Sequence, residues 1–88
     1  MQIIRTVFSD PCHSWMRVER QELFDLGIAE HISEYSYQAQ TYAYLEEDVD
    51  MPKYIRAKKD QGWDVITKDN YSNSDSKIRW YKAFSAKN

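Results

Sequence analysis

Hydrophobic and polar residues alternate over several short stretches of this chain, and a period of two is typical of β-strands. The alternation predicts strands at 2–8, 15–18, 63–67 and 78–84. It is clearest within 33–45, which carries four tyrosines in pairs spaced by two: Tyr35, Tyr37, Tyr42 and Tyr44. We expect them on the two strands of a hairpin that turns within 38–41. Such tyrosines either pair across the strands as structure or serve as binding hot spots.

Two further stretches have the spacing of short helices. In 19–26, Leu23 and Leu26 form an apolar side, and Gly27 follows at the position where many helices end in a left-handed conformation. A second helix is predicted between an acidic run at 46–50 and Gly62, with Pro52 in its first turn. Its inward side follows the spacing i, i+3, i+4 and i+7 at Met51, Tyr54, Ile55 and Lys58.

The order of these elements predicts an α+β fold. We expect one domain over residues 1–88, with a small antiparallel or mixed sheet of four to five strands and two short helices on one face. The polar stretch 69–76 is predicted to be a loop, and residues 85–88 are expected to fray.

Composition narrows the possible functions only modestly. Twelve basic and 14 acidic residues give a net charge of −2, which predicts neither a general nucleic-acid binder nor an extremely acidic decoy protein. The single cysteine, Cys12, allows no internal disulfide, as in proteins of a reducing compartment. No stretch approaches the roughly 20 apolar residues of a membrane span, so we expect a cytoplasmic protein.

Residues suited to catalysis or to metal binding are few. Cys12, His13 and His31 are the only cysteine and histidine candidates, and they lack the spacing of a metal site or the third group of a catalytic dyad. The only glycines, Gly27 and Gly62, are too far apart for a phosphate-binding loop. We therefore expect no metal, no cofactor and no catalytic site, which leaves binding as the function.

Two surfaces could bind a partner. The first is the acidic run, in which Asp48 or Asp50 could cap the second helix, or the whole run could dock on an Arg/Lys-rich surface. The residues expected to make these contacts are Glu46, Glu47, Asp48 and Asp50, with Tyr35 and Tyr42 nearby. The second surface is basic and aromatic and would bind nucleic acid through Arg56, Lys59, Arg79 and Trp80. Its alternative is a solvated helix face and a strand with Ile78 and Trp80 inward.

Several segments together resemble a pattern in small uncharacterised proteins of bacteriophages and other mobile elements. They are Leu26-Gly27-Ile28, Ile32-Ser33, Tyr35-Ser36-Tyr37 and Tyr44-Leu45-Glu46-Glu47-Asp48 with Asp50. The resemblance implies an accessory protein acting in the cytoplasm of an infected bacterium, where many such proteins bind and block a host complex, including CRISPR complexes. The sequence thus predicts an inhibitor that binds a host protein, with nucleic-acid binding as the alternative. Pairing of edge strands into a homodimer stays open.

Overall fold

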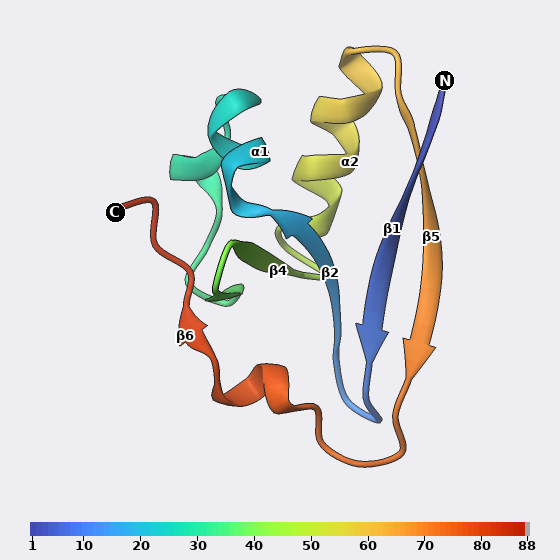
Figure 1. The fold of residues 1–88 in the computed structure, drawn as a ribbon, viewed down its shortest axis with the longest axis vertical. Helices are drawn as coiled ribbons and strands as arrows, with labels where there is room; N and C mark the ends of the chain where they lie inside the picture. The colour runs from blue at the N-terminus through green and yellow to red at the C-terminus, as the bar shows by residue number, and fades with distance from the viewer. Residues whose placement is uncertain (88) are drawn as a thin grey trace.

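The computed structural model describes residues 1–87 as one mixed sheet with helices packed on it (Figure 1). The strands are β1 (Gln2–Ser9), β2 (Ser14–Glu19), β3 (Tyr37–Ala39), β4 (Tyr42–Glu46), β5 (Asp64–Tyr71) and β6 (Lys82–Ala83). The α-helices are α1 (Arg20–Asp25) and α2 (Met51–Asp60), and the short 3-10 helices are η1 (Ala29–His31) and η2 (Lys77–Trp80). The predicted α+β class is confirmed.

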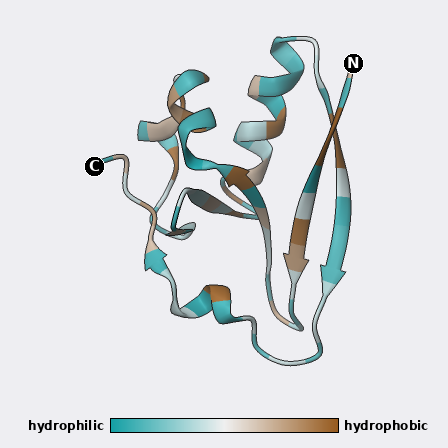
Figure 2. Ribbon diagram, viewed as in Figure 1, coloured by the Kyte–Doolittle hydropathy of each residue, from teal (hydrophilic) through white to brown (hydrophobic). Residues whose placement is uncertain are grey.

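Six strands form the sheet, slightly more than the predicted four to five, in the order β5-β1-β2-β4-β3-β6. All neighbouring strands are antiparallel except β1 and β5, which pair in parallel over eight residues, from Gln2 opposite Asp64 to Ser9 opposite Tyr71. This pairing makes β5 longer than the predicted strand at 63–67 and shortens the predicted loop. The edge strand β5 is mostly hydrophilic toward its C-terminal end (Figure 2).

One face of the sheet carries the main hydrophobic core, and both α-helices lie on this face, as predicted. Met16 and Val18 of β2 point into it, as does Leu45 of β4, and all three are buried. They meet Leu23 of α1 and Tyr54 of α2. The helical spacing seen in the sequence is therefore the spacing of the inward side of α2, because Met51 and Tyr54 are buried and Ile55 packs against them.

Both glycines end an α-helix. Gly27 has a φ of 73° and Gly62 a φ of 89°, in the left-handed region that glycine adopts without a steric cost. After α1, the amides of Gly27 and Ile28 donate back to the carbonyls of Phe24 and Leu23. The amides of Gly62 and Trp63 do the same after α2, to Lys59 and Lys58. Each helix thus ends in the double hydrogen bond of a Schellman motif, as Gly27 indicated in the sequence.

The other face of the sheet is aromatic. Because side chains alternate along a strand, Trp15 and Tyr44 point away from the helices and pack against Ile78 of η2. Phe8, Tyr37 and Tyr81 lie against this smaller cluster. The chain after β5 therefore folds back across the sheet and covers part of its second face.

The predicted strand at 78–84 is wrong over its first half. Residues 77–80 form η2, because the Ser76 hydroxyl accepts a hydrogen bond from the Ile78 amide and starts a helical turn. Only Lys82–Ala83 pairs as a strand, with β3. Consequently Ile78 is buried as expected, but Trp80 points outward with 82% of its surface exposed.

The hairpin prediction is confirmed for β3 and β4, with Tyr37 opposite Tyr44. The two strands turn through Gln40, which has a φ of 57°. The first strand is shorter than expected, because residues 33–36 form a turn and not a strand. At the other end of the chain, Ser85 and Lys87 do not fray as expected, because their carbonyls accept hydrogen bonds from Arg20. Residue 88 of that prediction lies outside the described residues.

An acidic and aromatic groove as candidate functional site

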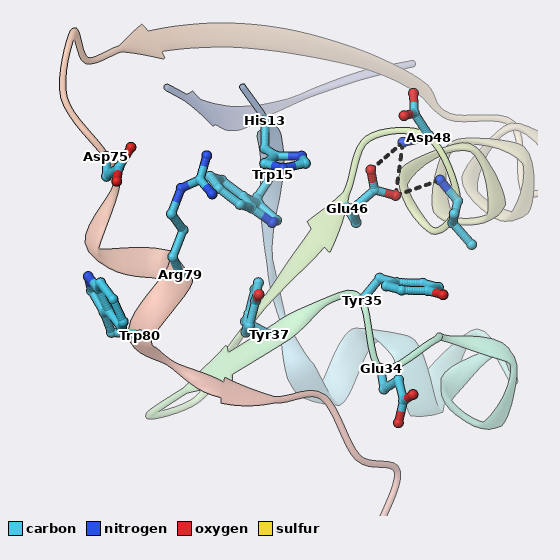
Figure 3. A pocket seen from close by; sticks show the side chains of 11 residues that line it. His13, Trp15, Glu34, Tyr35, Tyr37, Glu46, Asp48, Asp75, Arg79 and Trp80 are labelled. Atoms are coloured by element: carbon cyan, nitrogen blue, oxygen red, sulfur yellow. Dashed lines mark hydrogen bonds between the residues drawn. The ribbon is translucent and has the colours of Figure 1, made fainter. Parts of the chain in front are cut away.

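An open groove of about 630 Å³ lies where the 33–36 turn, the segment before α2 and η2 come together over the aromatic face (Figure 3). Its lining residues are His13, Trp15, Glu34, Tyr35, Tyr37, Glu46, Asp48, Val49, Asp75, Arg79 and Trp80. The groove thus brings together residues of the two surfaces that the sequence treated as separate, the acidic run and the Arg79–Trp80 segment.

The floor of the groove consists of packed aromatic rings. Trp15 is 2% exposed, and its ring meets the edge of Tyr37 with ring centres 6.2 Å apart. His13 lies beside Trp15 at 5.8 Å between ring centres. Aromatic pairs in such tilted arrangements stabilise one another beyond simple burial. The floor therefore offers a preformed surface that needs little ordering when a partner binds.

Exposed apolar side chains line the rim. Tyr35 is 67% exposed and projects from the 33–36 turn, while Trp80 is 82% exposed at the end of η2 (Figure 3). Val49, next to the acidic run, is also exposed. Large exposed aromatic side chains around a hollow are typical of binding surfaces, in which tyrosine and tryptophan contribute much of the affinity.

Carboxylates surround these aromatic rings. Glu34, Asp48 and Asp75 are exposed, and none of them forms an ion pair within residues 1–87. Glu46 is more firmly held, because its carboxylate accepts the amides of Asp48 and Val49, the latter at 2.9 Å (Figure 3). The acidic run is thus fixed by its own turn and keeps free negative charge on the groove side.

The one guanidinium that lines the groove belongs to Arg79 and is neutralised by an ion pair with the Asp10 carboxylate. Arg79 donates to both oxygens of Asp10, at 2.7 and 2.9 Å, and stacks over Trp15. The Asp10 side chain is shielded from solvent and also accepts the amides of Cys12, His13 and Ser76. The hydrogen bond from Arg79, with those amides, holds the pKa of Asp10 far below its usual value. The groove therefore presents a net negative surface.

Asp50 occupies the N-cap position of α2, but its side chain makes no hydrogen bond to the helix amides. The side chain is fully buried and therefore does not lie on the surface, where a partner contact was predicted. It accepts hydrogen bonds from the Ser33 amide and from the hydroxyls of Ser33 and Ser36, and it pairs with Lys53 at 3.0 Å. Burial raises the pKa of Asp50, but these hydrogen bonds outweigh it and the net pKa is lowered. Asp50 thus holds the Tyr35 turn against α2.

The other predicted contact residues are scattered. Glu47 is exposed beside the groove but does not line it, and Tyr42 lies further along the aromatic face. On α2, Arg56 borders a different hollow, together with His31 and Lys53. Because Arg79 and Trp80 belong to the groove, they do not join Arg56 and Lys59 in one nucleic-acid site.

Arg17 is a functional candidate that the sequence did not indicate. Its guanidinium lies 4.8 Å from the ring centre of Tyr42 and 5.2 Å from that of Phe8, on the open part of the aromatic face. Four other half-buried basic side chains each pair with a carboxylate: Arg5, Lys53, Lys58 and Arg79. Among residues 1–87, no carboxylate oxygen lies within 4.0 Å of the Arg17 guanidinium. The only sequence signal was its spacing of two from Trp15 in the predicted strand, which places both side chains on the same face.

In the described part of the chain, no group of three or more His, Cys, Asp or Glu side chains is arranged to hold a metal ion. None of the helices in residues 1–87 is both long enough and apolar enough to cross a membrane. Comparison with known proteins finds no matching family model, no matching curated protein and no matching solved structure.

Proposed function

We propose that this protein is a binding module whose acidic groove takes an Arg/Lys-rich segment of a partner protein. The observation that carries the proposal is the arrangement, around one hollow, of exposed aromatic rings and exposed carboxylates that form no ion pair within residues 1–87. Arginine and lysine side chains are attracted both to ring faces and to carboxylates, so the groove offers two complementary contacts to each of them.

The geometry of the groove favours an extended peptide segment, and not a single ion, as the ligand. Tyr35 and Trp80 stand on opposite parts of the rim, with Asp75 on the Trp80 side and Glu34 and Asp48 on either side of Tyr35 (Figure 3). An extended basic peptide that crosses the groove from Trp80 to Tyr35 would bring cationic side chains near the carboxylates at both ends while its backbone stays in solvent. Binding of this kind depends on charge and therefore weakens as salt concentration rises.

The resemblance to bacteriophage proteins supports a more specific form of this proposal. A basic protein surface of the kind that fits this groove commonly binds nucleic acid, so its occupation would block a nucleic-acid-handling complex of the host bacterium, such as a CRISPR complex. In this form the protein acts as an inhibitor in the host cytoplasm and performs no catalysis of its own.

A labelled peptide of alternating arginine and glycine tests the groove by fluorescence anisotropy. We expect the wild-type protein to bind it at low salt, and the triple charge reversal Glu34→Lys, Asp48→Lys and Asp75→Lys to weaken binding by about tenfold or more. The matched control reverses three exposed acids outside the groove, Glu19, Glu30 and Asp60. Equal loss in both variants would reduce the effect to net charge and refute a specific groove.

The same assay with labelled oligothymidylate tests nucleic-acid binding, the second candidate function. It is favoured by Arg17, whose guanidinium lies near two rings and forms no ion pair within residues 1–87, so it could meet a phosphate while a base stacks nearby. Binding that falls steeply with salt and is weakened by Arg17→Ala, but not by Arg56→Ala, would support this candidate. No anisotropy change at about 50 mM salt would exclude it.

A further inference from the structure

Among residues 1–87, no strand pairs with the outer edge of β5. β5 pairs with β1 on one side only, and it is the terminal strand of the six-stranded sheet. In Figure 1 no other element lies along its outer side. Neither a proline nor a break in the register interrupts its eight residues. Such an edge is a ready template for pairing with another strand.

The hydrogen bonds of β5 show which backbone groups are free. The Asp64 amide donates to Met1 and the Ser72 amide donates to Ser9, so the even-numbered residues of β5 direct their backbone groups toward β1. Because these directions alternate along a strand, the odd-numbered residues, including Val65 and Thr67, direct theirs outward. These unpaired groups can accept a second strand only in certain registers.

We infer that β5 pairs antiparallel with β5 of a second copy of this chain, about a two-fold axis at Ile66. In this register Val65 and Thr67 exchange backbone hydrogen bonds with Thr67 and Val65 of the other copy, using the outward groups. Asp64 of each copy then lies directly opposite Lys68 of the other. The pairing joins both sheets into one.

Charge selects this register over its neighbours. Centred on Lys68, the pairing would place the two lysines face to face, which is unfavourable. Centred on Thr67, it would place Lys68 opposite Ile66 and leave no opposite charges directly across the junction. Only the register at Ile66 forms the Asp64–Lys68 pair twice. The lysine that would otherwise protect the edge from pairing thus becomes part of the contact.

The apolar side chains on this face agree with the same register. Ile4 of β1 is opposite Ile66 of β5, and the two are 65% and 42% exposed. With the axis at Ile66, the two copies of Ile66 form a non-hydrogen-bonded antiparallel pair, in which opposite side chains lie closest together. The two copies of Ile4 flank this pair. Four isoleucines exposed in the separate copies would then form one continuous row.

Sedimentation velocity over about 1 µM to 1 mM protein tests the dimer, because its population follows mass action. We expect a monomer–dimer equilibrium that Asp64→Lys or Lys68→Asp alone weakens by about tenfold or more, since each change turns two attractive pairs into two repulsive ones. An equimolar mixture of the two variants restores the charge pairs and should form a heterodimer. The double variant with both changes should dimerise with itself.

Thr67→Pro supplies an independent variant, because its amide faces outward and is not used by β1. We expect it to prevent dimerisation, with circular dichroism confirming that the variant is folded. Should it not fold, the charge variants decide alone, since Asp64 and Lys68 are both exposed. A monomer at every concentration, or a dimer unaffected by the charge variants, would overturn the inference.

Discussion

Ser36 is small and fully buried, and it links two elements through its hydroxyl. The hydroxyl donates to Asp50 at 2.5 Å and accepts the Glu46 amide at 2.9 Å. It therefore joins the turn that carries Tyr35 to the carboxylate before α2. A buried polar group left without its partner costs more than the hydrogen bond itself contributes.

Substitution Ser36→Ala should accordingly lower the free energy of unfolding by about 1–3 kcal/mol, because the buried Asp50 carboxylate and the Glu46 amide each lose a partner. Urea denaturation followed by circular dichroism measures the change. Ser72→Ala, in an exposed position, is the matched control and should stay within about 0.5 kcal/mol of the wild type. Similar stabilities for the two variants would contradict the role given to Ser36.

Single residues also show what sequence reasoning could not predict at this scale. Asp10 and Arg79 are 69 positions apart, and no local pattern links them. Asp50 belongs to a run of acids predicted to lie on the surface, and only the fold shows that it is buried, because Ser33 and Ser36 come from a separate segment. Side-chain networks between distant segments leave no periodicity in the sequence, so these roles had to come from the structure.

At the scale of elements, local signals predicted more. Gly27 and Gly62 marked the helix ends, and the i, i+3, i+4 spacing identified the buried side of α2. Lys58 was predicted on the inward side of α2, and its side chain is 12% exposed and pairs with Glu22. These features were predictable because each depends on neighbours within a few residues.

The C-terminal segment shows where local signals fail. Alternation of Ile78 and Trp80 favoured a strand, but a 3-10 helix also places some residues inward and others outward. The choice was made by Ser76 and by Asp10, which accepts the Ser76 amide from across the molecule. Tertiary contacts thus overrode a weak β-propensity.

The end of α1 allows a clean test of a backbone effect. A Cβ at Gly27 would meet no atom within 4 Å, so Gly27→Ala changes only the cost of the left-handed conformation. We expect a loss of about 1–2 kcal/mol in the free energy of unfolding. Gly27→Asn should cost less, because asparagine tolerates this conformation better. Equal stability of the wild type and the alanine variant, measured in urea, would show that the helix ends differently in solution.

For the whole molecule, two shielded carboxylates couple stability to pH. The folded protein lowers the pKa of both Asp10 and Asp50, whereas the unfolded chain returns both to roughly 3.9. Their stabilising contribution is therefore complete well above pH 4 and is lost as the pH falls below it, because the unfolded state binds protons first.

Thermal denaturation at about pH 7, 5 and 3 should show nearly equal Tm values at the two higher pH values and a marked drop at the lowest. Asp50→Asn should lower the Tm at pH 7 and reduce the further drop at pH 3, since one of the two titrating carboxyls is gone. A variant that falls as steeply as the wild type between pH 5 and 3 would show that Asp50 does not contribute to the acid sensitivity.

The parallel pairing of β1 with β5 has a consequence for how the chain reaches this fold. Residues 2 and 64 are paired across 61 intervening residues, and closing this loop costs more conformational entropy than closing the short β1–β2 turn. Proteins dominated by such distant contacts fold slowly. During refolding, β1 would thus pair first with β2, its antiparallel neighbour, and β5 would be added late. The strand exposed for longest to other chains would be the one whose outer edge stays free in the native protein.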